Sequence, residues 1–442
     1  MALRSVGAMT NDIDTDDSST YARNVTGRQG VLRAPGSARR AAAAVLLAAV
    51  LAGAAAPAAF AATPARPPAV APAGRGTLLA LTPVGAFDRQ QVVAYETQAG
   101  IKGAPLRYGV RAYRLTYATV TPHGRPTTAT GLLVLPVGGP RRLDLVSDTH
   151  GTVTHRDSAP SGGIGDNRLT AYLHASAGRA VAAPDYLGLG GGPGRHPYMD
   201  TRSSVTASHD MLRAARAAAA RLGRPVSRDV YVTGFSQGGQ VAMALGRELA
   251  RPGSGFRLRA LAPIAGPYDI AGEQVPALFD GRVDPHSGVF YLSYFLTAQN
   301  RLHPLYKSPS DVFKAPYASF VEDLFDGRHQ EDAVLAALPA DAGRLLTPAW
   351  AAGLRHPHGV LKAVLTSNSR ACDWKPAVPV RLYAAAGDRD VPIGNSRSCA
   401  RDLVAHGARA VRVVDQGADA THFVSAFRSA PRTARWFDSL AD

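Results

Sequence analysis

The sequence predicts an α/β fold in which a mostly parallel sheet carries helices on both faces and holds an inserted, mainly helical cap. Three observations support this fold class. Strand-like and helix-like segments alternate from about residue 110 onward, which is typical of parallel sheets covered on both faces. The alternation breaks between about residues 270 and 376, where aromatic side chains become more frequent. It then resumes and continues to the C-terminus, so the insertion separates two core strands.

The first predicted elements form a β-hairpin. Residues 110–120 and 127–137 are rich in β-forming side chains, and a turn with two prolines and a glycine separates them. After the hairpin, strands are predicted at 143–147, 180–183, 229–233 and 258–264, and helices at 166–177, 203–222 and 237–250. After the insertion, strands are predicted at 378–384 and 410–414, and helices at 395–405 and 421–440.

The N-terminal part reads as processing sequence rather than as folded domain. Residues 1–61 are predicted to be an extension plus a secretion signal, in which two arginines precede an apolar run and cleavage falls near Ala61/Ala62. Because a signal normally begins the chain, we hypothesise that translation starts near Val31. Residues 62–76 are rich in proline and alanine and are expected to be a disordered leader. The catalytic domain is expected to span 77–442.

Composition excludes several classes of protein. The formal net charge is +15, but arginine is spread along the chain without a compact basic run, so we expect no nucleic-acid binding. No stretch after the signal is long and apolar enough to predict a stable membrane span. We therefore expect a secreted monomer, for which transient contact with a lipid surface remains open.

The two cysteines indicate the redox compartment of the protein and whether it has a metal site. An even number of cysteines in an exported chain favours a disulfide, here between Cys372 and Cys399; the alternative is two free thiols. The sequence has no CxxC motif and no cluster of cysteine and histidine, so we expect no metal and no cofactor.

The strongest chemical motif is Gly234-Phe235-Ser236-Gln237-Gly238. The pattern alone is weak in a chain with 44 glycines, but a predicted strand ends at it and a predicted helix begins directly after it. This context is that of a nucleophile elbow, a tight turn that lifts the serine above the sheet edge in α/β-hydrolases. The alternative is a glycine-rich turn with a bystander serine. Ser236 is therefore predicted to be the nucleophile.

A serine nucleophile needs a base and an acid, which follow it in the order serine, acid, histidine on this fold. His422 lies after the last predicted strand and is the preferred base; a surface histidine at a helix start is the alternative, and His356, His358 and His406 are poorer candidates. Asp388, after the preceding strand, is the preferred acid. Asp390 is the alternative acid, and Asp269 is a more distant one.

Acyl transfer also requires hydrogen-bond donors for the oxyanion. One is predicted to be the backbone N–H of Gln237, next to the nucleophile. The second is expected in the loop after an early strand, from Thr152 or, close behind it, Gly151. An ordinary glycine turn is the alternative interpretation of this loop.

Together these residues resemble the secreted α/β-hydrolase lipase/esterase family that includes fungal secretory lipases and their bacterial relatives. The resemblance runs from about residue 105 to the C-terminus and rests on His150-Gly151-Thr152, on residues 184–190 with His196-Pro197-Tyr198, on residues 234–239, on Asp373-Trp374-x-Pro376, on Asp388-x-x-Val391-Pro392 and on His422-Phe423. It implies a helical lid over an acyl pocket and a triad of Ser236, Asp388 and His422.

The sequence thus favours a serine hydrolase that cleaves small-molecule or lipid carboxylic esters through an acyl-enzyme. Two alternatives stay open. An exported serine peptidase would need an acidic anchor for the substrate amine, for which the insertion offers Glu322, Asp323, Asp326, Glu331 and Asp332. A non-catalytic binding protein could also use this scaffold. The acyl length is not readable from residues 270–376.

Overall fold

The computed structural model describes residues 73–440. The predicted extension and signal, including the proposed start near Val31, lie outside the described residues, as does most of the predicted leader. Residues 73–76 lie against the edge of the sheet, where the N–H of Gly76 donates to the carbonyl oxygen of Ala118 at 2.8 Å.

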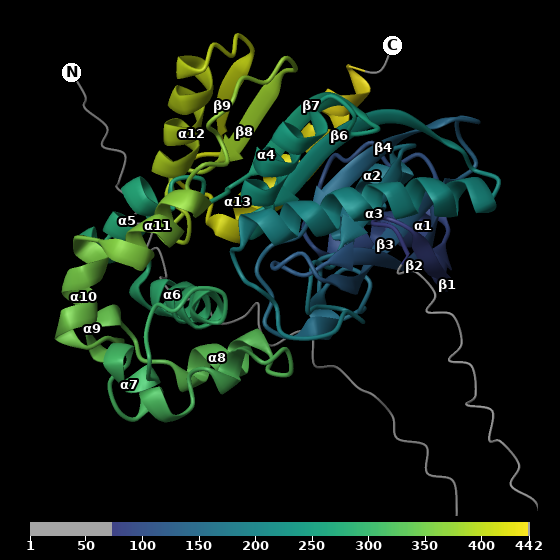
Figure 1. Cartoon of the computed structure of the whole chain (residues 1–442). Coiled ribbons are helices and arrows are strands. Elements are labelled where there is room, and N and C mark those ends of the chain that lie inside the picture. The colour runs from purple at the N-terminus through teal and green to yellow at the C-terminus, as the bar shows by residue number, and fades with distance from the viewer. Residues whose placement is uncertain (1–72, 441–442) are drawn as a thin grey trace, which may run out of the picture. The chain divides into compact units, whose positions relative to one another are not determined.

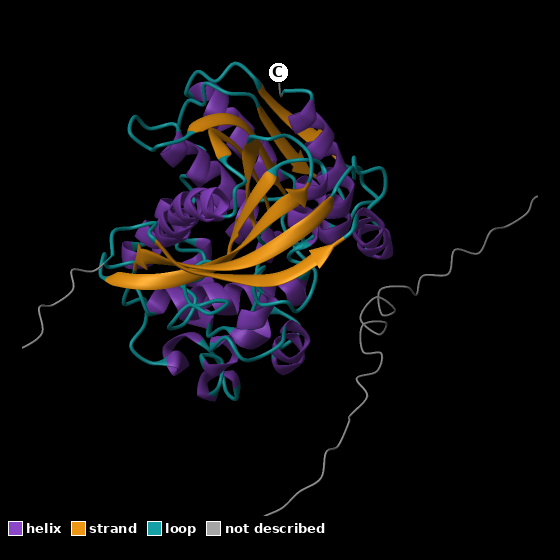
Figure 2. Ribbon diagram, turned by 90° about the vertical axis from the view of Figure 1, so that its right-hand side faces the viewer, coloured by secondary structure: helices purple, strands orange, loops and turns teal. Residues whose placement is uncertain are grey.

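The described part of the chain contains one nine-stranded sheet, ordered β1-β2-β3-β5-β4-β6-β7-β8-β9. The first four strands in this order pair antiparallel, and the pairs from β5–β4 to β8–β9 are parallel. Figure 2 shows the strong twist of the sheet. The strands are β1 (Leu78–Phe87), β2 (Gly109–Val120), β3 (Pro126–Val137), β4 (Leu143–Thr149), β5 (Ala180–Pro184), β6 (Val226–Phe235), β7 (Arg257–Ile264), β8 (Val380–Ala384) and β9 (Val411–Asp415).

Helices cover both faces of the sheet, because the central strands are apolar on both sides. On one face α3 (Thr201–Arg221), α4 (Gln237–Leu249) and α12 (Gly394–Ala405) pack in one core cluster. On the other face α1 (Arg89–Gln98), α2 (Leu169–Ser176) and α13 (His422–Asp438) contribute to a second cluster. These elements confirm the predicted mostly parallel α/β architecture.

A helical cap lies between β7 and β8, as the fold prediction expects, and it forms a separate body of helices in Figure 1. It has its own apolar core, in which buried phenylalanine, leucine and valine side chains meet. Its helices are η2 (Ile270–Gln274), α5 (Val275–Asp280), α6 (Pro285–Asn300), α7 (Pro309–Val312), η3 (Tyr317–Ser319), η4 (Asp323–Phe325), α8 (Glu331–Ala337), α9 (Ala342–Leu345), α10 (Pro348–Arg355) and α11 (Gly359–Asn368).

Stacked aromatic rings join the cap to the sheet domain. Tyr198, from the loop before α3, stacks on Tyr294 of α6 with ring centroids 4.1 Å apart, and Tyr294 stacks on Phe325 at 4.4 Å. The hydroxyl of Tyr294 also donates to the carbonyl oxygen of Val153 at 3.3 Å. Offset aromatic stacks add to apolar burial, so this column fixes the cap over the carboxyl ends of the strands.

Two further findings concern covalent and membrane features. Cys372 and Cys399 form a disulfide, as predicted, which ties the chain before β8 to helix α12.

In the part of the chain that the structure describes, no helix combines the length and the apolarity that crossing a membrane would need.

Candidate active site

The turn between β6 and α4 holds Ser236 in an unusual backbone conformation. Its φ of 56° and ψ of −121° lie outside the regions that residues other than glycine normally adopt. The N–H of Ser236 donates to the carbonyl oxygen of Ile264 at 2.9 Å, which pins the turn to the neighbouring strand. Such strain persists only where the surrounding structure enforces it, and it is frequent at functional sites.

The glycines on both sides of Ser236 are required by close backbone contact. A Cβ at Gly238 would lie 1.9 Å from the carbonyl oxygen of Thr149, and one at Gly234 would lie 2.0 Å from the hydroxyl of the same threonine. The small residues of the motif therefore allow the turn to pack against the end of β4. This packing brings the loop after β4 beside Ser236.

His422 and Asp388 meet at the edge of the sheet next to Ser236. His422 begins α13, and its Nδ1 lies 2.7 Å from Oδ2 of Asp388, which follows β8. Oδ1 of the same carboxylate accepts the backbone N–H groups of Asp390 and Val391, each at 2.9 Å. Nε2 of His422 is buried and has no hydrogen-bond partner among the described residues.

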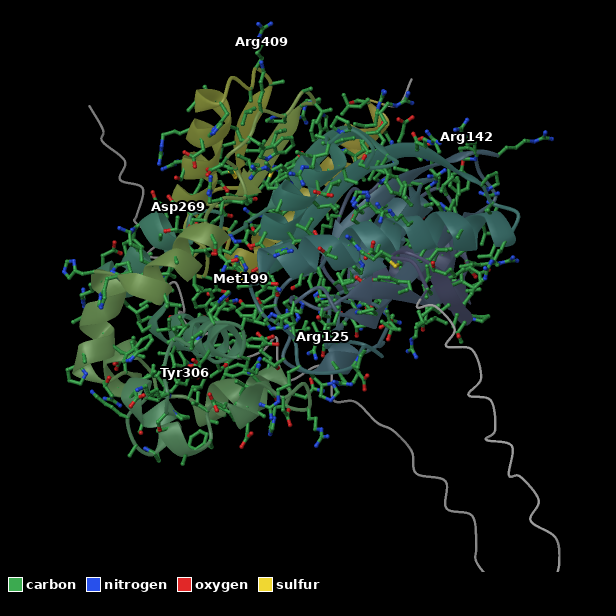
Figure 3. All side chains as sticks on the ribbon, viewed as in Figure 1. Arg125, Arg142, Met199, Asp269, Tyr306 and Arg409 are labelled. Atoms are coloured by element: carbon green, nitrogen blue, oxygen red, sulfur yellow. A yellow bond between two sulfur atoms is a disulfide. The ribbon has the colours of Figure 1, made fainter. Side chains whose placement is uncertain are left out.

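The alternative acids lie elsewhere. Oδ2 of Asp390 accepts the hydroxyl of Tyr291 at 3.3 Å. Asp269, labelled in Figure 3, caps η2 by accepting the N–H of Gly272 and also accepts the hydroxyl of Ser398. The other histidines considered in the sequence, at 356, 358 and 406, lie at helix ends of the cap and of α12.

The loop after β4 lies directly beside the nucleophile. A Cβ added at Gly151 would lie 3.5 Å from Cβ of Ser236. The N–H of Thr152 makes no hydrogen bond within the described residues, and its side-chain hydroxyl lies 2.8 Å from the hydroxyl of Tyr198. Gln237 is the first residue of α4, where helix N–H groups lack intrahelical acceptors. The predicted oxyanion donors are thus grouped around Ser236.

Two cavities meet at Ser236. The larger, of about 330 Å³, is lined by Ser236, His422, Gly151 and Thr152 and by side chains of α2, α13 and the start of α8. The smaller, of about 60 Å³, is lined by Ser236, Gln237 and mostly apolar side chains of the cap, and by Met199 at the junction of cap and sheet in Figure 3. Tyr291 lines both cavities, so it forms part of the wall between them.

Three carboxylates act on His422. Burial disfavours the imidazolium, but Asp388, followed by Asp390 and Glu331, outweighs burial and raises the pKa of His422 above its usual value. Glu331 is half-buried at the start of α8, and its burial, followed by the nearby Asp390 and Asp332, raises its pKa to about 7. His422 therefore sits in a negative field.

Three residues at the site had no predicted role in ester hydrolysis. Tyr291 lies in an apolar run of the cap, and Glu331 was considered only as one of five candidate anchors for the substrate amine of a peptidase. His196 was one of the residues on which the family resemblance rests, but no function was predicted for it. Its Nδ1 lies 2.9 Å from the carbonyl oxygen of Leu187, so Nδ1 donates and Nε2 accepts the side-chain N–H of Gln237 at 3.0 Å. Nothing in the local sequence signals this contact.

Comparisons with known proteins support the fold and the type of enzyme. No protein-family model matches the chain, and no curated protein matches it in sequence. Among solved structures, a putative hydrolase from Legionella pneumophila is similar with a TM-score of 0.76 and 25% identity over 82% of this chain and 98% of its own. A ligand-bound form of the rice cell wall degrading esterase LipA from Xanthomonas oryzae has a TM-score of 0.74 and 28% identity, over 83% of this chain and 98% of its own.

Lipase A from Candida antarctica shares the fold at a TM-score of 0.60, with 14% identity over 79% of this chain and 78% of its own. The structural neighbours are thus hydrolases of the lipase and esterase type. They confirm the predicted fold class and the resemblance to lipases and esterases.

Proposed function

We propose that the chain is a secreted serine hydrolase that cleaves carboxylic esters through an acyl-enzyme on Ser236. One observation carries the proposal: Ser236, on a strained turn between strand and helix, shares a cavity with a histidine whose other ring nitrogen contacts a buried carboxylate. This constellation is the one that activates a serine hydroxyl.

In the proposed first step, Oγ of Ser236 attacks the ester carbonyl and its proton passes to Nε2 of His422. Asp388 accepts a hydrogen bond from Nδ1–H, which leaves Nε2 as the basic nitrogen and stabilises the imidazolium that forms. The backbone N–H groups of Gln237 and of Thr152 or Gly151 stabilise the oxyanion of the tetrahedral intermediate.

In the second step the intermediate collapses. His422 donates its proton to the leaving alkoxide, the C–O bond of the ester breaks, and the acyl group stays on Ser236. Water then enters, gives a proton to Nε2 and attacks the acyl-enzyme, and collapse of the second intermediate releases the acid and restores the serine hydroxyl. Apart from the hydrolytic water, these steps use protein groups alone.

The position of His422 distinguishes the two cavities. The leaving group must lie within reach of Nε2, and His422 lines the larger cavity but not the smaller one. We therefore assign the leaving group to the larger cavity and the acyl group to the smaller, apolar one. The lining of the smaller cavity by Leu292, Phe295 and Val275 suits an apolar acyl chain.

Secretion is part of the proposal. It is supported by the signal-like segment in residues 1–61 and by the disulfide between Cys372 and Cys399, because disulfides persist in oxidising compartments.

The test is hydrolysis of p-nitrophenyl esters by the wild type and by Ser236→Ala, together with labelling by a fluorophosphonate probe. We expect the variant to lose at least about a thousandfold in turnover, because triad members act as a unit, and labelling to require Ser236. Near-normal turnover of the variant would remove Ser236 from the mechanism. Failure of the folded wild type to react with the probe would favour a non-catalytic binding protein.

The peptidase alternative now has a specific objection. A peptidase that trims the amino end holds the substrate amine on the acyl side of the scissile bond. None of the described residues that line the smaller cavity is charged, whereas Glu331 lines the larger one. Parallel assays on p-nitrophenyl esters and aminoacyl anilides decide between the two activities, and we expect turnover of the esters.

A further inference from the structure

The larger cavity is acidic, although the chain as a whole is basic. The sequence has 49 lysines and arginines against 34 aspartates and glutamates. Among the described residues that line this cavity, three are carboxylates (Asp148, Asp166 and Glu331) and none is a lysine or an arginine. Basic side chains such as Arg142 and Arg409 project away from the molecule in Figure 3. The sign of charge inside the cavity is thus opposite to the net charge.

No lysine or arginine in the described part of the chain neutralises these three carboxylates, and His422, whose charge acts on Glu331, is already paired with Asp388. None of them takes part in an ion pair within residues 73–440. Asp148 is buried and accepts only a hydroxyl hydrogen bond, from Thr170 at 2.6 Å. Two histidines of the wall, His150 and His174, have pKa values lowered by burial, so they supply no positive charge at neutral pH.

A further buried carboxyl group lies near two of these carboxylates. Glu96 on α1 is buried, and neither of its carboxyl oxygens has a hydrogen-bond partner among the described residues. Burial, followed by the charges of Asp148 and Asp166, raises the pKa of Glu96 to about 9. Glu96 is thus protonated at neutral pH mainly because burial disfavours its charged form, and the charges of Asp148 and Asp166 add to this effect.

Unsatisfied polar atoms mark the cavity as a place for a ligand. Nε2 of His422 and Nδ1 of His174 belong to side chains that are 3% and 1% exposed, and both atoms lack partners in the described structure. Nδ1 of His422 is held by Asp388, so Nε2 on the opposite edge of the ring faces the cavity. Buried polar groups are normally hydrogen-bonded; Nε2 of His422 serves Ser236 and then the leaving group in the proposed mechanism, so an ester bound in this cavity would contact it.

Aromatic rings complete the wall near the nucleophile. Phe235 lies 4.5 Å from the ring of His422 and 5.7 Å from the ring of Phe423, measured between centroids, and Tyr291 and Phe427 also line the cavity. Aromatic faces together with carboxylates are the groups that bind ammonium ions, including quaternary ones.

We propose that the larger cavity binds a cationic leaving group, so that the preferred substrates are esters of alcohols that carry a protonated amine or a quaternary ammonium. This inference rests on the proposed ester hydrolysis at Ser236 and specifies its substrate class. Glu331 lines the same cavity as His422 and interacts with its charge, so it is within electrostatic reach of a leaving group bound there. Asp166 is solvent-exposed at the cavity wall and attracts the cation as it enters.

The test compares butyrylcholine with neohexyl butyrate, in which carbon replaces the ammonium nitrogen, so the two esters share shape and acyl group. At about pH 8, above the pKa of about 7 of Glu331, and at low ionic strength, we expect kcat/KM of the wild type to favour the choline ester by about tenfold or more. Glu331→Gln should reduce this ratio by about threefold or more, and Asp166→Asn should reduce it by less.

Asp332→Asn is the matched control, because it removes the same charge from the next residue of α8, an exposed position outside the cavity. It should change the ratio by less than about twofold. Because the readout is the ratio of kcat/KM for the two esters, any effect of a substitution on catalysis that is common to both esters cancels.

Equal kcat/KM for the two esters, or a ratio that Glu331→Gln and Asp166→Asn leave unchanged, would overturn the proposal while Ser236-dependent hydrolysis of p-nitrophenyl butyrate still upheld the proposed function. Absence of hydrolysis of all three esters would contradict both.

Discussion

Oδ2 of Asp388 lies 2.7 Å from Nδ1 of His422, and both side chains are buried, at 0% and 3% exposure. The second oxygen of Asp388 is held by two backbone N–H groups, so the carboxylate has little freedom to turn. The neighbouring Asp390 instead contacts Tyr291. This difference gives each aspartate a distinct expected role in catalysis.

Asp388→Asn should lower kcat/KM for p-nitrophenyl butyrate by about a thousandfold to ten-thousandfold, because an amide favours the wrong imidazole tautomer and does not stabilise the imidazolium. Asp390→Asn should change it by less than about tenfold, since its charge acts on His422 only at longer range. Steady-state kinetics on both variants measure the two changes in kcat/KM, and circular dichroism checks that both variants are folded. A larger loss in Asp390→Asn would reassign the acid.

The pH dependence of the reaction should report the negative surroundings of His422. The base must be neutral, so kcat/KM rises with pH through the pKa of His422, which Asp388 raises against the effect of burial. We expect the acidic limb of the profile above about pH 6.5, the unperturbed value for histidine. Glu331→Gln removes a nearby negative charge and should move the limb to lower pH by about half a unit. Movement in the opposite direction would contradict the electrostatic account.

The order of elements in the core could be predicted from sequence because hydrophobic periodicity and turn residues act locally. The hairpin, the parallel strands and their helices all appear within a few residues of their predicted limits. The exceptions are β1 and α1, which were not predicted. β1 is an edge strand whose residues are mostly exposed or half-buried, and α1 buries only Val92 and Glu96, so neither has a clear apolar period.

The site was only partly predictable for a related reason. Gly234, Ser236 and Gly238 are adjacent in sequence, and His422 and the aspartates follow strand ends, so their order along the chain carries information. Tyr291 and Glu331 reach the site through the packing of the cap against the sheet domain, and His196 reaches it through the packing of the loop before α3 against α4. That packing depends on contacts between residues far apart in sequence, such as the stack of Tyr198 on Tyr294, which no local pattern specifies.

Acyl-chain length should be limited by the smaller cavity. Its volume of about 60 Å³ offers room for about four water-sized groups, so the wild type should prefer butyrate over octanoate and longer esters. Leu292→Ala should shift the optimum to longer chains, because Leu292 lines this cavity. Leu296→Ala is the matched control: it lies one turn later on α6, is buried in the cap core and lies outside the cavity lining. An equal shift in both variants would point to a loosened cap instead.

Glu96 should make the folded protein less stable as the pH rises. Its pKa is raised from 4.5 to about 9 by burial, followed by Asp148 and Asp166. Below pH 4.5 the carboxyl is protonated in both the folded and the unfolded chain, and no penalty arises. Between these two values the unfolded chain releases the proton and the folded chain keeps it. The free energy of unfolding therefore falls with pH, by about 3 kcal/mol between pH 4.5 and 7.

Glu96→Gln removes this titration, so the stability of the variant relative to the wild type should increase with pH over the same interval. The substituted glutamine buries an amide without partners, but the cost in free energy is the same at each pH. Only the change with pH in the difference between the unfolding free energies of variant and wild type therefore tests the prediction. Urea denaturation of both proteins at about pH 5 and pH 7.5 measures it, and Asp332→Asn, at an exposed position, provides the control. A stability difference that stays constant with pH would mean that Glu96 ionises normally in the folded protein despite its burial.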